Sequence, residues 1–182
     1  MSSVTNERSV SSYRVKTLAI SAVLAALALI FSYVEAIIPP IVPMPGVKLG
    51  IANLVIIIAL YSIDFKHAFT INIVRIVVAG LLFGGLFGML YSLAGGVLSL
   101  IVMGLLKRTK LFSIVGVSMA GGVTHNLGQL IVAALIVENA KMFLYFPVLL
   151  FSGLVTGILI GIAAHIINKN LPKGLFAKEE NY

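Results

Sequence analysis

Six long apolar runs, separated by short polar segments, most constrain how this chain can fold. They cover roughly Thr17–Ile38, Val47–Ile63, His67–Phe83, Leu86–Leu106, Ser113–Val137 and Phe143–Ile167. A helix needs about 20 residues to cross the ~30 Å hydrocarbon core of a bilayer, and each run approaches that length. Only 10% of the 182 residues are charged while 60% are hydrophobic, which is too little polar surface for a soluble domain of this size. The sequence therefore predicts an all-α membrane protein with a bundle of six transmembrane helices.

The boundary between the third and fourth runs is the least defined. The second and third runs are short, and the break at Phe83-Gly84-Gly85 can shift by several residues. Five spans thus remain an alternative, although six place both termini on one side of the membrane.

The positive charges predict the orientation. With the N-terminus inside, ten of the thirteen basic residues fall in inner segments: Arg8, Arg14, Lys16, Lys66, Lys107, Arg108, Lys110, Lys169, Lys173 and Lys178. Lys48 and Lys141 then lie outside and Arg75 within a span. Because cytoplasmic segments carry the excess of Lys and Arg, we expect both termini in the cytoplasm. The expected location is the plasma membrane of a bacterium. The expected parts are a flexible tail over 1–16, a transmembrane domain over 17–168 and a C-terminal tail over 169–182.

A proline-rich segment, Pro39–Asn53, joins the first two runs. Each proline lacks a backbone donor and fixes φ, so a helix cannot continue through it. Non-helical backbone at membrane depth survives only where protein or a water-filled cavity protects it. On this orientation the segment lies outside, and it is expected to roof and line an extracellular pocket. A plain connector between two helices would have the same composition.

Polar side chains within the spans mark the candidate binding residues, because such groups are expensive in a bilayer. His125 lies twelve residues beyond Ser113, about 18 Å from the inner boundary at ~1.5 Å per residue. Counting along each helix in this way places groups from four helices in the outer half of the membrane. The predicted substrate-binding residues are Glu35, Lys48, Asn53, Arg75, Tyr91, His125, Asn126 and Gln129.

Structural roles compete with ligand binding for these residues. Glu35 and Lys48 can pair across the proline-rich segment, and Asn53 can bond a neighbouring helix. His125 shares a face with Gln129 that can equally be an interhelical seam. Arg75 requires an acceptor, which can be Glu35, a helix C-terminus or an anionic ligand.

Small residues recur at four-residue spacing on three helices. They are Ala22 and Ala26 on the first, Gly88, Ser92 and Gly96 on the fourth, and Gly153, Gly157 and Gly161 on the sixth. Such faces let helix backbones approach closely in membranes. We expect packing within the chain for the fourth and sixth helices. For Ala22 and Ala26, docking of another membrane protein is the alternative.

The sequence argues against an enzyme and predicts no cofactor or metal site. Cysteine is absent, and Asp64 is the single aspartate, so clustered carboxylates for Mg²⁺-assisted prenyl or phosphoryl transfer are missing. No Walker loop is present. The three histidines fall in different helices with no carboxylate at ligand spacing.

Three segments carry a resemblance to a known family. Pro45–Val55 (PGVKLGIANLV), Leu81–Gly96 (LLFGGLFGMLYSLAGG) and Thr124–Leu130 (THNLGQL) resemble the Gx transporter family, also called component I of heptaprenyl diphosphate synthase. The likeness runs from Leu18 to about Ile167. This family is in turn similar to the substrate-binding S components of energy-coupling-factor (ECF) transporters.

The resemblance implies a six-helix subunit that captures a vitamin, flavin, quinone precursor or other micronutrient from outside. It implies association with a membrane scaffold subunit and two ATPase subunits, with Ala22 and Ala26 docking the scaffold. Pro39–Gly46 occupies the position of the gating loop. No nucleic-acid partner is expected. Two alternatives remain: a membrane partner in quinone- or flavin-linked electron transfer, and an accessory to polyprenyl diphosphate and menaquinone synthesis.

Overall fold

The computed structural model describes residues 2–38 and 50–172, with side chains from residue 14 onward. This part of the chain is helical, without strands. Its elements are α1 (Ser2–Ile37), α2 (Ile51–Ser62), α3 (Phe65–Ala79), the π-helical turn η1 (Gly80–Gly84), α4 (Gly85–Thr109), α5 (Ile114–Ile136), the 3₁₀ turn η2 (Ala140–Tyr145) and α6 (Phe146–Asn170).

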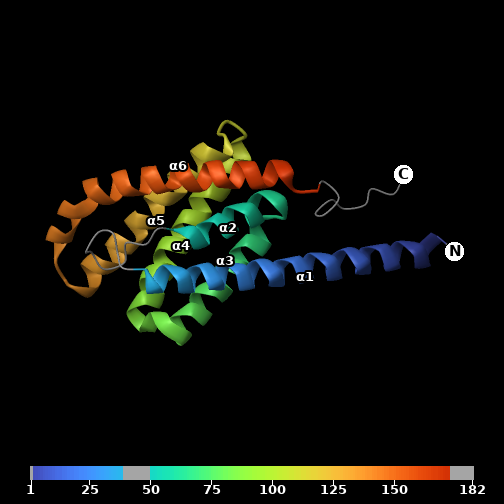
Figure 1. Ribbon diagram of the computed structural model, residues 1–182, viewed down its shortest axis with the longest axis horizontal. Coiled ribbons are helices and arrows are strands. Elements are labelled where there is room, and N and C mark those ends of the chain that lie inside the picture. The colour runs from blue at the N-terminus through green and yellow to red at the C-terminus, as the bar shows by residue number, and fades with distance from the viewer. Residues whose placement is uncertain (1, 39–49, 173–182) are drawn as a thin grey trace.

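Four of the described stretches are long and apolar enough to cross a membrane. They are Arg14–Ile37, Phe65–Thr109, Ile114–Ile136 and Ala140–Asn170. α2 is apolar but has only 12 residues, about 18 Å of helix. The chain is therefore a multi-pass helical membrane protein, and the count of six crossings stays a prediction. Figure 1 shows the N-terminal end of α1 and the C-terminal end of α6 at the same end of the molecule.

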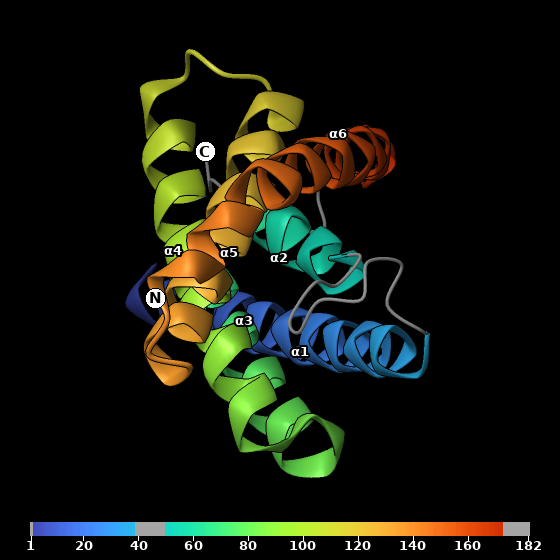
Figure 2. The same cartoon turned by 90° about the vertical axis from the view of Figure 1, so that its left-hand side faces the viewer.

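The 45-residue stretch Phe65–Thr109 is a hairpin of two helices. Its chain reverses at η1 and Gly85, whose φ of +66° is a backbone conformation that favours glycine. Gly80 faces Met89 near the turn, and Gly104 faces Phe65 at the far end, so α3 and α4 run antiparallel. Figure 2 shows this turn, in green, projecting at the bottom of the view. The third and fourth apolar runs are therefore separate helices, and the break lies where the glycines predicted it.

Glycines bring α5 and α6 into backbone contact. A Cβ atom on Gly157 would lie 2.7 Å from Cα of Met119, and one on Gly161 would lie 2.7 Å from Cα of Val115. The predicted packing role of the α6 glycines is thus confirmed. On α4 the prediction holds only in part, because Gly96 packs against Asn72 of α3 whereas Gly88 has no atom within 4 Å of such a Cβ.

α2 lies between α1 and α6 in both views (Figures 1 and 2). Seven of its twelve residues are buried, including the whole run Val55–Leu60. A helix that is apolar on every side suits such an enclosed position. Its side chains form the centre of the hydrophobic core together with Ala28 of α1 and Leu100 of α4.

One face of α1 packs against α2 and α3. Ala28, Ser32 and Glu35, at spacings of four and three residues, are its buried side chains. Ala22 and Ala26 lie on its exposed side. The helix begins at Ser2, so nearly all of the expected tail over 1–16 continues α1; no proline or glycine interrupts it.

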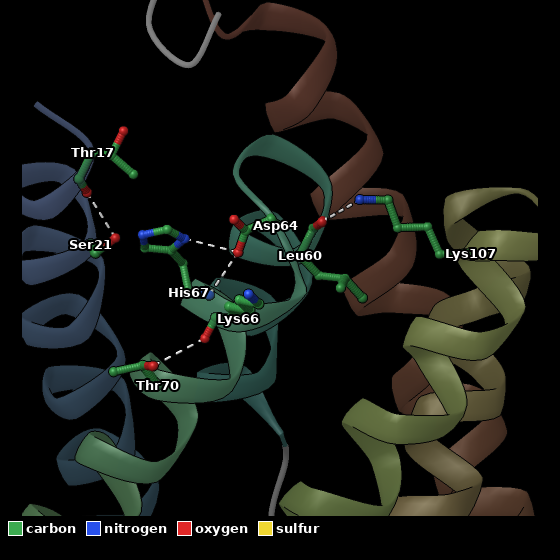
Figure 3. Close-up of polar contacts among 8 residues, drawn as sticks. All are labelled: Thr17, Ser21, Leu60, Asp64, Lys66, His67, Thr70 and Lys107. Atoms are coloured by element: carbon green, nitrogen blue, oxygen red, sulfur yellow. Dashed lines mark hydrogen bonds and ion pairs between the residues drawn. The ribbon is translucent and has the colours of Figure 1, made fainter. Parts of the chain in front are cut away.

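Polar side chains close the turn between α2 and α3 (Figure 3). Asp64 caps α3 by accepting from the backbone N–H of His67 at 2.8 Å, and its carboxylate also contacts His67 Nδ1 at 2.8 Å. Lys107 of α4 donates to the carbonyl of Leu60 and lies over the ring of Tyr61, 5.0 Å from its centroid. Lysine thus binds a carbonyl in the last turn of α2 that the helix itself leaves free.

Candidate functional site

A small pocket lies between α2, α4, α5 and α6. Asn53, Ser99, Ser118, His125, Asn126 and Thr156 contribute the polar side chains of its wall. The apolar part consists of Ile57, Met103 and Ile160, with glycines between them. An apolar cavity with a few converging polar groups is the usual form of a small-molecule site.

Glycines on α5 and α6 explain why space remains here. Gly121, Gly122 and Gly157 line the pocket. Gly122 and Gly157 lie at the close contact between α5 and α6, whereas Gly121 faces Met103 and Ser99 of α4. Close backbone approach and missing side chains therefore leave a cavity at a helix crossing that larger residues would fill.

The start of α2 positions Asn53 at the pocket. Gly50 precedes the helix with φ +76°, which glycine adopts without strain. Its carbonyl accepts from the backbone N–H of Asn53 at 2.8 Å. Glu35 of α1 accepts from the N–H of Ile51, so a carboxylate binds a donor that the first turn leaves unpaired.

Arg75 of α3 is held by protein acceptors beside the pocket. Its Nη2 donates to Asn53 Oδ1 and Asn72 Oδ1, both at 2.9 Å, and its Nε donates to Asn72 Oδ1 at 3.1 Å. Nη1 lies 3.5 Å from the Ser32 hydroxyl of α1, and the charge of Glu35 also acts on Arg75. Arg75 is 7% exposed, so it joins three helices at a point where water is scarce.

Asn126 and His125 present polar groups from α5. Asn126 Nδ2 donates to the carbonyl of Leu149 on α6 at 2.8 Å. His125 packs against Gly95 of α4, where an added Cβ would lie 3.1 Å from the imidazole Cε1. Both side chains are thereby fixed by neighbouring helices.

The predicted binding residues fall into several places. Asn53, His125 and Asn126 line the pocket. Glu35 and Arg75 belong to the neighbouring polar network. Tyr91 is half-buried on α4 and Gln129 is buried on α5, and neither lines the pocket. Lys48 and the Pro39–Gly46 segment lie outside the described residues.

Sequence reasoning missed two hydroxyl groups of the pocket wall, Ser99 and Thr156, and did not include Ser118 among the candidate residues. The available signal was their position beside small residues: Ser99 follows the Gly95–Gly96 pair by three residues, and Thr156 precedes Gly157. Hydroxyl groups next to helix-contact glycines are candidates for the wall of any cavity that the contact leaves.

Within residues 2–38 and 50–172, no group of three or more His, Asp or Glu side chains is placed to hold a metal ion. His67 pairs with Asp64 at the α2–α3 turn, away from His125 in the pocket.

Comparison with known proteins places the chain in a family. Searches of curated proteins and of solved structures found no match. The sequence model of the family described as heptaprenyl diphosphate synthase component I matches residues 24–167, a range that includes every described residue of the pocket. The chain belongs to the heptaprenyl diphosphate synthase component I family.

Proposed function

We propose that this membrane protein is the substrate-binding subunit of an ECF-type importer and captures a small micronutrient from outside the cell. The observation that carries the proposal is the pocket between α2, α4, α5 and α6, where Asn53, His125 and Asn126 converge. Three of the residues predicted from the sequence thus meet around one cavity.

The chemistry of the pocket supports a small solute. The wall consists of amides, hydroxyl groups and an imidazole, which can bind a solute through hydrogen bonds. Energy for transport would come from two partner ATPase subunits.

The exposed side of α1 supports docking of a scaffold subunit. Ala22 and Ala26 are one turn apart and exposed, whereas Ala28 packs inside the bundle. Small side chains on a lipid-facing surface allow a second helix to approach its backbone closely.

A binding experiment tests the capture of a solute. Purified protein is titrated with vitamins, flavins and quinone precursors, and binding is measured calorimetrically. We expect at least one ligand to bind, His125→Ala to weaken its binding, and His165→Ala, on an exposed part of α6, to leave it unchanged. A panel without any ligand would remove the main support for the proposal.

Co-purification tests the docking face. Ala22→Leu combined with Ala26→Leu should prevent a scaffold subunit from co-purifying with the chain. Ala36→Leu is the control, because it is exposed on the same helix about 15 Å beyond Ala26. Equal recovery of the scaffold with all three proteins would exclude this surface.

The description of the family favours one second candidate, an accessory component of a heptaprenyl diphosphate synthase. In that role the chain would support a separate catalytic subunit. It predicts that synthase activity in membranes falls when this chain is deleted and returns when it is restored. Unchanged activity after deletion would leave the importer subunit as the remaining proposal.

A further inference from the structure

We propose that the pocket recognises an uncharged amide-like group, which places a carbonyl toward α2 and an N–H toward α5 and α6. Two asparagines with fixed orientations, Asn53 and Asn126, carry this inference, and Arg75 acts as a positioning residue for the first. The inference rests on the proposed binding function and specifies the chemistry of its ligand.

Asn53 presents a donor. Its Oδ1 accepts from Arg75 Nη2 at 2.9 Å, so the Nδ2 end of the amide points away from the guanidinium. That nitrogen lies on the pocket side, where a Cβ on Gly50 would be 3.6 Å from it. No described residue accepts a hydrogen bond from it. The α2 wall therefore offers an N–H pair to a carbonyl.

Arg75 is bound by protein acceptors and does not itself take this role. Asn72 Oδ1 receives both Nε and Nη2, and Ser32 lies near Nη1. The guanidinium is not part of the pocket wall. Its function here is to fix which end of the Asn53 amide faces the cavity.

Asn126 presents a hydrogen-bond acceptor, in contrast to the donor of Asn53. Its Nδ2 donates to the Leu149 carbonyl at 2.8 Å, which leaves Oδ1 as the end of the amide available to the pocket. Thr156 on the next helix donates its hydroxyl proton to the carbonyl of Ser152 at 2.9 Å. The α5–α6 wall therefore offers acceptors, and a ligand must bring a donor to it.

The composition of the pocket wall favours a neutral ligand. The lining residues that the structure describes include no Lys, Arg, Asp or Glu. A carboxylate or phosphate would meet the acceptors of Asn126 and Thr156, and burying an unpaired charge there is costly. Amides, lactams and imides carry a carbonyl and an N–H in one rigid group, which matches both walls at once.

A pair of variants separates recognition from folding. Asn53→Asp keeps an oxygen for Arg75 but turns the pocket-facing donor into an acceptor. Asn72→Asp is the matched control: it places the same new charge beside Arg75, yet Asn72 does not line the pocket and its Nδ2 has no partner among the described residues. Thermal unfolding of both variants shows whether the fold is retained.

The probes are nicotinamide, uracil and 2-pyridone, each at millimolar concentration, with nicotinate and orotate as charged counterparts. We expect at least one neutral probe to bind the full-length protein and the charged probes to bind more weakly. Asn53→Asp should weaken that binding about tenfold or more, as expected when a buried hydrogen bond is replaced by repulsion between acceptors. Asn72→Asp should change the affinity by no more than about twofold. Asn72 does not line the pocket, and substitutions at residues away from a contact act independently of it.

Three results would overturn the inference: equal binding of charged and neutral probes, no binding of any neutral probe, or equal affinities of Asn53→Asp and wild type. If an anionic micronutrient binds and Asn53→Asp leaves its affinity unchanged, the amide chemistry is wrong while the binding function stands. If neither these probes nor the micronutrient panel bind, the proposed function itself fails.

Discussion

Replacing Gly153 by alanine should separate α5 from α6 and destabilise the protein. A Cβ at this position would lie 2.8 Å from the Gly122 carbonyl oxygen, 2.9 Å from its carbonyl carbon and 2.9 Å from the Val123 nitrogen. All three atoms belong to the backbone of α5, so no side-chain rotation can relieve the contact. The two helices must move apart.

The distance by which α5 and α6 must separate determines the expected loss of stability. Ordinary contacts begin at 3.4 Å, so the closest pair must separate by about 0.6 Å. A gap of about 0.5–1 Å removes a quarter to a half of the dispersion attraction between facing atoms, and the same shift loosens the contacts at Gly157 and Gly161. We therefore expect a loss of about 1–3 kcal/mol in the free energy of unfolding, the usual cost of overpacking.

Gly88→Ala is the matched control. It lies on α4 with nothing within 4 Å of its would-be Cβ, and alanine in a helix interior is favoured over glycine by about 1 kcal/mol. Unfolding of both variants in detergent, measured by circular dichroism against denaturant, should shift in opposite directions. If Gly153→Ala is as stable as Gly88→Ala, the close α5–α6 contact described here is incorrect.

Two further predictions concern the α2–α3 turn. Lys107→Met should lower the free energy of unfolding by about 1.5–3 kcal/mol, the range for hydrogen bonds from charged groups, because the Leu60 carbonyl loses its donor; an unchanged denaturation midpoint would contradict this. Asp64→Ala should cost about 1 kcal/mol through loss of the helix cap. Burial raises the pKa of Asp64, but hydrogen bonds from the backbone and imidazole of His67 outweigh it and lower the pKa overall. The cap should therefore stabilise the fold fully above the unfolded-state pKa of about 3.9 and lose its effect as the pH falls through the lower folded-state pKa. Wild type and Asp64→Asn should thus approach each other in stability at acidic pH, and a constant difference between them would refute that sign.

The helices were predictable because length and apolarity dominate their positions. The run Ser113–Val137 corresponds to α5 within one residue at each end, and Gly84 and Gly85 marked the reversal between α3 and α4. The beginning of α1 was not predictable in the same way. Its polar first turns have no apolar periodicity, although they also contain no helix breaker.

The depth of the site residues in the membrane was predictable from the sequence. The direction in which each side chain points from its helix was not. Counting residues placed Asn53 and His125 at similar depth, yet it could not tell that Arg75 turns toward Asn72 rather than into the cavity. The acceptors of Arg75 are a neighbour on its own helix and an amide from α2, and such pairing depends on helix rotation. The Thr156 hydroxyl was missed because its one signal in the sequence, the neighbouring Gly157, was used only to predict helix packing.

The short central helix α2 has a consequence for how the protein responds to its lipids. Both of its ends bind protein groups, Glu35 at Ile51 and Lys107 at Leu60, and its middle is buried. Hydrophobic mismatch acts on helices whose surfaces meet the acyl chains. Changes in bilayer thickness should therefore tilt α4 and α6, whose outer faces are exposed, while α2 keeps its length and partners. The part of the pocket wall that α2 forms should therefore keep its geometry when the lipid composition changes.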